Sequence, residues 1–479
     1  MKREFLLNII FLLTANLLIK PFYLFGIDRT VQNTVPESEY GLYFALFNFT
    51  FLFQIVNDFG IQNFNNRNIA QHRHLLYKYF PNILVLKSGL GLLFFLLVLL
   101  LGFLAGYAPA HTGLLLLIAF NQLLNSLMLY LRSNVSGLGH YRLDSLLSVT
   151  DRLLLIVLCG ALLWGHVLPG PFRIEWFVWA QTLALASTCL IAFSIVRQHL
   201  SQLRFRINRP FLALLLRRSA PYALSIFLMT AYYRLDGIMI ERLLPDGARE
   251  AGLYASAYRL YEASNMLGFL FASLLLPIFS RMLAEKEDPS ALALLSYRLI
   301  TAGALALFSG VVYFRTDIMV LLYDSGSAYS GRILLYLCAS FVAVAGTYIF
   351  GTLLVANGNM RRLNYIFAGG LALNLLLNAL LIPWLKAEGA ALATCGTQFF
   401  VLISELILAR RLLRIPFRPT LWLQIGVYLV LLLLAGYALT RLDGPAWYWA
   451  FALLMGTGAA LGIGLRLIDL RALLRLREA

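Results

Sequence analysis

The sequence is short of charge for its length. Only 13% of its 479 residues are Asp, Glu, Lys or Arg, whereas 60% are apolar, and the mean hydropathy is +0.77. A soluble chain carries about 25% charged residues and folds into domains whose surfaces those charges cover. The shortage therefore excludes a water-soluble enzyme and indicates a chain that lies mostly within a bilayer.

Residues that build catalytic and metal sites are also scarce. The four cysteines lie inside apolar runs without the spacing of a disulfide or a metal site. The six histidines lie at or near predicted loops. The sequence contains no phosphate-binding glycine loop, zinc spacing or nucleophile elbow. We therefore expect no catalytic residues, no metal and no cofactor.

Long apolar runs occupy most of the chain. A transmembrane helix needs about 20 apolar residues, and unbroken runs such as 90–101 favour helices over the alternating pattern of a membrane barrel. We predict an all-α polytopic membrane protein with about 14 transmembrane helices. The predicted spans are 4–26, 40–60, 81–106, 112–134, 144–165, 174–196, 218–243, 252–279, 292–314, 331–355, 363–382, 388–409, 420–439 and 446–466.

Basic residues are distributed unevenly between the two sides of these spans. The segments on the side of both termini hold about 26 Lys and Arg, and the opposite segments hold about eight. By the positive-inside rule, both termini and the basic linker 197–217 are cytoplasmic. The same rule accounts for the net charge of +16, so we expect no nucleic-acid partner. The short loops leave no room for a soluble domain.

Two short patterns recur in the same order and on the same predicted side of the membrane. Residues 39–45 (EYGLYFA) are similar to 250–256 (EAGLYAS), and 139–144 (GHYRLD) are similar to 359–364 (NMRRLN). They suggest two tandem halves of the same orientation, related by an axis along the membrane normal. The predicted organisation is an N-terminal six-helix bundle (1–196), a basic linker (197–217), a C-terminal six-helix bundle (218–409) and two additional helices with a tail (410–479).

Five charged residues lie deep in predicted spans, where a charge costs at least about 2.5–3.5 kcal/mol. Lys20 either reaches the outer interface or lines a cavity. Arg234 and Asp236 point to different helix faces because they are two residues apart, so each either pairs with another helix or lines a cavity. Arg259 and Glu262, spaced i and i+3, can pair with each other and still contact a ligand.

Other charges lie nearer the predicted ends of spans. Lys87 and Arg152 are within reach of the cytoplasmic interface, and extension of their side chains into it explains them. Glu405 lies on the face of Gln398, and we expect it to pair with Arg410 or Arg411.

Several segments resemble bacterial polysaccharide-biosynthesis flippases. These are Asp58-Phe59-Gly60 with Arg67-Asn68-Ile69-Ala70, the segment 235–240 (LDGIMI), the segment 252–260 (GLYASAYRL), and Pro277. The resemblance extends over all predicted spans. It places the chain with the O-antigen and other lipid-linked oligosaccharide flippases of the multidrug/oligosaccharidyl-lipid/polysaccharide exporter superfamily.

The resemblance implies a V-shaped pair of six-helix bundles around a central cavity, in the cytoplasmic (inner) membrane of a bacterium. It also implies that an undecaprenyl-diphosphate-linked oligosaccharide crosses that membrane by alternating access, with H+ or Na+ as coupling ion. A transporter with this many helices can form its pathway as a monomer.

The charge inventory distinguishes two kinds of cargo. An anionic diphosphate would bind cavity cations, and Arg234, Lys20 and Arg259 are the candidates. The alternative is a cation-coupled drug or small-molecule antiporter of the same superfamily, which would favour cavity carboxylates such as Asp236 and Glu262. These two carboxylates could also couple ions or pair structurally. A polymerase or ligase would need a sizeable outer loop, which the sequence lacks.

Overall fold

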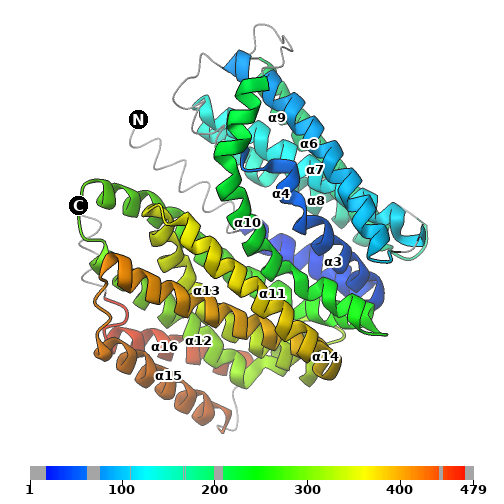
Figure 1. Ribbon diagram of the computed structural model, residues 1–479. Coiled ribbons are helices and arrows are strands. Elements are labelled where there is room, and N and C mark those ends of the chain that lie inside the picture. Colours follow the sequence, from blue (N-terminus) through cyan, green and yellow to red (C-terminus); the bar gives the residue numbers. More distant parts are fainter. Residues whose placement is uncertain are drawn as a thin grey trace. The chain divides into compact units, whose positions relative to one another are not determined.

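The protein is all-helical wherever its structure is described. The computed structural model describes residues 18–61, 76–107, 109–165, 167, 169–198, 209–441 and 446–469, and every regular element in these ranges is a helix (Figure 1). Eleven of these helices are long and apolar enough to cross a membrane. The predicted all-α, polytopic fold class is therefore confirmed, although most of the first predicted span (4–26) lies outside the described residues.

The chain divides between Glu241 and Arg242 into two compact units. The sequence-based division, at the linker 197–217, lies one helix earlier, and residues 199–208 of that linker lie outside the described ranges. The pairing of two six-helix halves stays a prediction. The recurring patterns do fall at matching places, because 39–45 and 250–256 lie at the starts of two helices, as do 139–144 and 359–364.

The first unit is built around a core of four long helices, α6 to α9. Buried Phe80 of α6 stacks on Tyr130 of α7 with ring centroids 5.6 Å apart, and side chains of α8 and α9 complete the same apolar cluster. The helices of this unit are η1 (Tyr23–Asp28), α2 (Arg29–Thr34), α3 (Glu37–Leu52), α4 (Gln54–Asp58), α6 (Leu76–Leu104), α7 (Pro109–Gly137), α8 (Tyr141–Trp164), α9 (Ile174–Arg197) and α10 (Arg209–Leu243).

The second predicted span is interrupted. Phe53 has φ −91° and ψ 0° and separates α3 from α4, and Phe59 in the left-handed region (φ 47°) ends α4. A buried cation lies at this helix end: Lys87 Nζ lies 2.9 Å from Asp58 Oδ1, 3.5 Å from the Asn57 carbonyl and, on α7, 2.7 Å from Ser126 Oγ. Lys87 is only 6% exposed. The prediction that it extends into the interface is therefore wrong, because its partners lie inside the unit.

The second unit contains a helical hairpin. Figure 1 shows the two arms of α14 side by side, meeting at a sharp turn. The turn is at Lys386, whose φ of 54° and ψ of −133° are not helical. The predicted spans 363–382 and 388–409 are the two arms. The helices of this unit are α11 (Gly247–Ala284), α12 (Ser290–Leu322), α13 (Ala328–Ala356), α14 (Met360–Leu413), α15 (Pro419–Thr440) and α16 (Trp447–Gly464).

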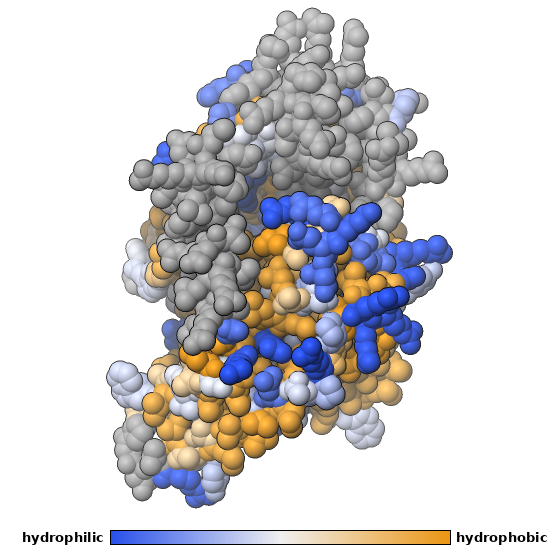
Figure 2. Space-filling view, turned by 90° about the vertical axis from the view of Figure 1, so that its left-hand side faces the viewer, coloured by the Kyte–Doolittle hydropathy of each residue, from blue (hydrophilic) through white to orange (hydrophobic). Residues whose placement is uncertain are grey.

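The last two helices pack on α12. The buried Tyr428 hydroxyl of α15 lies 3.2 Å from the Ala302 carbonyl of α12 and 3.0 Å from the Gly458 carbonyl of α16. Side chains of all three helices form one apolar cluster. Away from this cluster α15 exposes large apolar side chains, including Leu423 at 68%. Hydrophobic side chains (orange) likewise cover much of the surface seen in Figure 2, as expected of a lipid-facing exterior.

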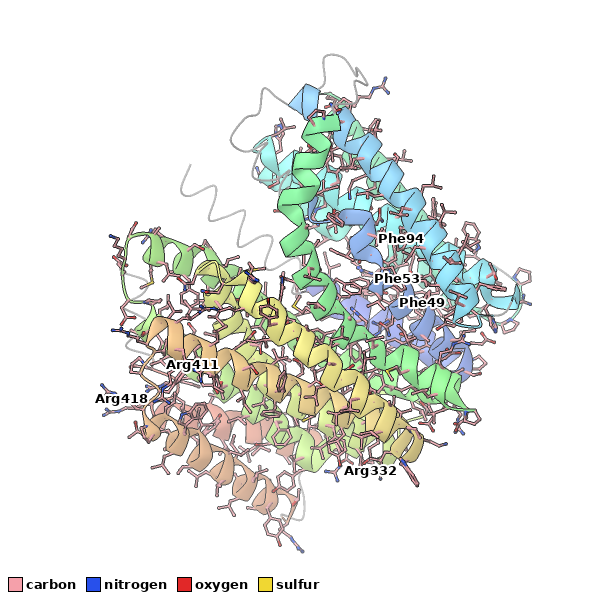
Figure 3. The ribbon with its side chains drawn as sticks, viewed as in Figure 1. Phe49, Phe53, Phe94, Arg332, Arg411 and Arg418 are labelled. Carbon is pink, nitrogen blue, oxygen red and sulfur yellow. The ribbon has the colours of Figure 1, made fainter. Side chains whose placement is uncertain are left out.

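Ion pairs hold the turn of α14. Lys386 Nζ lies 2.6 Å from Asp246 and 3.3 Å from Glu250, and Arg332 lies 2.8 Å from Glu388. Figure 3 shows Arg332 at this end of the second unit. The hydrogen bond from Lys386 lowers the pKa of the Asp246 carboxyl group below its usual value. These contacts attach the turn to the starts of α11 and α13.

Candidate functional site: buried cations in the two units

Arg234 lies half-buried on α10 and faces α3. Its Nη1 donates to Oδ1 of Asn48 at 3.2 Å. Its guanidinium lies 4.7 Å from the ring centroid of Phe51 and 5.8 Å from that of Phe47, within cation–π range. These contacts orient the guanidinium group toward α3.

A close approach of two helices explains this position. A Cβ atom on Gly237 would lie 2.7 Å from Asn48 Nδ2 and 2.7 Å from the Phe44 ring, so only glycine fits there. Arg234 lies about one turn before Gly237 on the same face of α10. The glycine thereby brings Arg234 against the aromatic side chains of α3. Asp236 is buried, at 1% exposure, and its spacing from Arg234 directs it to a different face.

Lys20 belongs to a second group of charges in the first unit. It is half-buried, and its charged neighbours are Arg152, Asp151 and Arg132. Arg152 lies 4.7 Å from the ring centroid of Tyr23 and 3.5 Å from Asp151. The residues that follow Lys20 form the π-helix η1, a local irregularity that often marks functional positions.

The partners of Lys20 were not predicted from the sequence. Arg132, at the end of α7, pairs with Asp144 of α8 at 2.8 Å. With Lys20 and Arg152, it makes three cations. Three carboxylates face them, because Asp28 acts on Arg152 beside Asp144 and Asp151, so the group is balanced in charge. One signal was available: Arg152 lies eleven residues beyond Tyr141, the start of α8, which is about 16 Å along the helix and too deep for a helix end.

Arg259 lies in the second unit, on α11. It is 9% exposed, between buried Tyr258 and Tyr261, and its Nη1 lies 2.7 Å from Glu262 Oε2. The ion pair expected from the i, i+3 spacing is therefore present. Glu262 retains 23% of its side-chain exposure, which leaves part of the pair accessible.

Glu405 of α14 is a carboxylate buried between helices. It is fully buried. Its carboxylate oxygens have no well-formed hydrogen bond within the described residues, although the Thr347 hydroxyl is near enough to interact with them. A Cβ atom on Gly351 of α13 would lie 2.9 Å from Oε1. Arg410 and Arg411 are exposed and lie more than a turn further along the helix. The predicted pairing with them is therefore wrong.

The fold is that of a class of membrane transporters. It is similar to a solved structure of lipid II flippase MurJ in an inward closed conformation, with a TM-score of 0.75, 14% identity, and coverage of 97% of this chain and 100% of that chain. It is also similar to an inward-facing multidrug resistance MATE family transporter, with a TM-score of 0.65, 13% identity, and coverage of 82% and 94%. A solved structure of a MOP superfamily transporter from Pyrococcus furiosus is similar as well, with a TM-score of 0.59, 14% identity, and coverage of 85% of this chain and 95% of that chain.

Sequence comparison then gives the family. The model of the polysaccharide biosynthesis protein family matches residues 5–283, more than half of the chain. The chain belongs to this family, and the resemblance noted in its sequence is confirmed. No curated protein matches it in sequence.

Proposed function

We propose that this protein is a flippase that translocates an undecaprenyl-diphosphate-linked oligosaccharide across the cytoplasmic membrane for cell-surface polysaccharide synthesis. The observation that carries the proposal is the polysaccharide biosynthesis family match, which extends over residues 5–283 of a chain with a transporter fold. A polymer assembled on a membrane lipid inside the cell has to reach the outer leaflet, and a multi-pass transporter is suited to that step.

The buried cations support an anionic cargo. A diphosphate carries negative charge and loses hydration on entering a membrane protein, and guanidinium groups bind phosphate oxygens in pairs. Arg234 and the group around Lys20 give the first unit partly exposed cations, and the second unit has the buried Arg259, paired with the partly exposed Glu262. We propose that these three residues contact the diphosphate during alternating access, while the lipid tail remains in the bilayer.

The remaining parts of the proposal concern coupling and location. We propose that H+ or Na+ drives transport, with Asp236 and Glu262 as the candidate carboxylates. We also propose that the protein works as a monomer in the bacterial inner membrane, with both termini in the cytoplasm.

Substitution of Arg234 tests the proposal. The assay is the accumulation of surface glycan in a bacterial strain lacking its own flippase, with the amount of membrane-inserted protein measured alongside. Arg234→Ala should reduce transport about tenfold, the effect of losing one charge-assisted hydrogen bond. Arg234→Lys should retain part of the activity because the charge is kept and the planar fork is lost. The matched control is Arg281→Ala, whose side chain is 78% exposed and should not matter.

Several results would contradict the proposal. Full activity of Arg234→Ala at normal protein level removes this residue from the site. Full activity of a variant with Lys20, Arg234 and Arg259 all changed to Ala rejects the cationic mechanism. Export of organic cations, with no effect on glycan, would favour the drug antiporter instead.

Collapsing the proton or Na+ gradient separately in the same assay identifies the coupling ion.

A further inference from the structure

The link between α14 and α15 is short and basic. Arg414, with φ 52° in the left-handed region, ends α14 abruptly. Pro419 occupies the first turn of α15, where a proline is tolerated because no amide hydrogen is needed. Residues 414–418 form a short non-helical connection between two helix ends, with a tight turn in which the Phe417 amide donates to the Ile415 carbonyl at 3.0 Å.

The link is anchored on the rest of the second unit. Ile415 is buried, at 2% exposure. The ring of Phe417 lies 5.4 Å from Phe350 of α13 and 6.3 Å from Trp422 of α15, measured between centroids. Side chains carried by the link are therefore presented from a fixed backbone.

Arginines surround an open pocket at this link. The pocket has a volume of about 480 Å³, and its lining includes Arg410, Arg414, Arg418 and Phe417. Figure 3 shows Arg418 together with Arg411 at this end of the second unit. Figure 2 views the molecule from this side, where hydrophilic side chains (blue) gather beside hydrophobic surface.

These arginines have no anionic partner in the described part of the chain. All four, Arg410, Arg411, Arg414 and Arg418, are exposed, and none forms an ion pair or a side-chain hydrogen bond with another described residue. Other cations of the same unit do pair: Arg259 with Glu262, Arg281 with Glu285, Arg332 with Glu388 and Lys386 with Asp246. Like charges held this close repel one another unless an anion neutralises them.

An apolar surface begins directly beside the pocket. On the first turn of α15, Trp422 is 42% exposed and Leu423 is 68% exposed, and further along the helix Val430 and Leu434 are exposed as well. Tryptophan at such a position is typical of the level of lipid head groups. A ligand that joins a phosphate to hydrocarbon chains matches both surfaces, whereas a free phosphate would use only the arginines.

We propose that this pocket binds the phosphate of an anionic phospholipid of the surrounding membrane, with the acyl chains of that lipid along α15. Guanidinium forks match phosphate oxygens in geometry and charge, and basic pockets between membrane helices on the cytoplasmic side bind anionic head groups. The pocket shares no residue with the cations proposed to contact the cargo, and the inference does not depend on the identity of that cargo.

Lipid binding to the purified full-length protein tests this inference. Native mass spectrometry of the detergent-solubilised protein measures binding of phosphatidylglycerol and of phosphatidylcholine, which lacks net charge. The wild type should prefer phosphatidylglycerol, and Arg410→Gln/Arg414→Gln/Arg418→Gln should lower its affinity by at least about tenfold. The control Arg281→Gln/Arg361→Gln/Arg362→Gln removes three exposed arginines at the same end of the unit and should keep the preference. Gel filtration checks that all forms are monodisperse.

Other outcomes would overturn the inference. Equal loss in both triple variants would mean that positive charge at this end attracts anionic lipid without a site. Full competition by millimolar inorganic phosphate would assign the pocket to a free anion. Preference for undecaprenyl diphosphate over phosphatidylglycerol would assign it to the cargo. Replacing the three pocket arginines by lysines serves as a further check, because a phosphate site should recover part of its affinity.

Discussion

Buried charged residues show most clearly what a single residue requires of its surroundings. Lys87 and Glu405 are both buried. Lys87 has a carboxylate, a hydroxyl and a carbonyl within hydrogen-bond range, whereas the carboxylate oxygens of Glu405 have no well-formed hydrogen bond among the described residues. A buried charge without partners costs free energy that a buried pair recovers in part.

Glu405→Gln should therefore stabilise the protein. The substitution keeps the shape of the side chain and removes the ionisable group, so we expect the free energy of unfolding to rise by about 1 kcal/mol. Thermal unfolding of the purified protein measures it. In contrast, Glu388→Gln, which removes the charge paired with Arg332, should not stabilise. A marked loss of stability in Glu405→Gln would show that Glu405 has an anionic role in the fold.

For single residues, the sequence predicts how deep a charged side chain lies in its span better than it predicts the residue that pairs with it. The i, i+3 spacing was enough to predict the ion pair of Arg259 with Glu262 because both residues lie on one helix. The partners of Lys87 and of Lys20 lie on other helices, and the sequence of one helix does not determine which neighbour it meets. Gly237 marks the close approach of α10 to α3, but a glycine in a membrane helix has several possible causes.

Among the helices, the turn of α14 departs furthest from regular geometry. Lys386 has a positive φ that favours glycine, and Gly389 packs so closely that a Cβ atom there would lie 2.5 Å from the Leu381 carbonyl oxygen. The ion pairs of Lys386 with Asp246 and Glu250 hold the turn in this conformation.

Two substitutions at Lys386 separate its backbone role from its charge. Both Lys386→Gly and Lys386→Ala remove the ion pairs, but only glycine adopts the positive φ without strain. We expect the glycine variant to melt about 2–4 °C above the alanine variant. Equal melting temperatures would mean that the turn relaxes to an ordinary conformation once the ion pairs are lost.

Most helices could be predicted from apolar length alone, and two exceptions have physical causes. The span 40–60 is predicted as one helix, yet it breaks at Phe53, and at the end of its second part, α4, Lys87 binds the Asn57 carbonyl. The hairpin of α14 was predicted as two spans, but the position of its turn was not, because a lysine is an unexpected residue for that conformation.

For the whole molecule, the positive-inside rule predicts which ends of the second unit face the cytoplasm. In a variant without the four native cysteines, Lys286→Cys in the α11–α12 loop should resist an impermeant maleimide in intact cells. Arg441→Cys, after α15, should react. Both positions are exposed. Reaction of Lys286→Cys and protection of Arg441→Cys would reverse the orientation and would place the arginine pocket in the outer leaflet.

The fold class and the family were within reach of the sequence because they depend on composition and on motifs at helix starts, such as 252–260 on α11. The basic linker 197–217 predicts a boundary between two halves, which stays a prediction. In the structure Gly237 and Arg234 join α10 to α3, and the first compact unit extends to Glu241.

The pair of Lys87 and Asp58 also has a consequence for biosynthesis. A lysine within a membrane helix opposes insertion by about 2.5–3.5 kcal/mol. Asp58 precedes Lys87 in the chain, so its countercharge has been made before α6 leaves the ribosome. The ion pair can therefore form as soon as α6 enters the membrane, and only the hydrogen bond to Ser126 has to wait for α7. The order of residues along the chain thus supplies Lys87 with a countercharge at the stage of insertion when this lysine is most exposed to lipid.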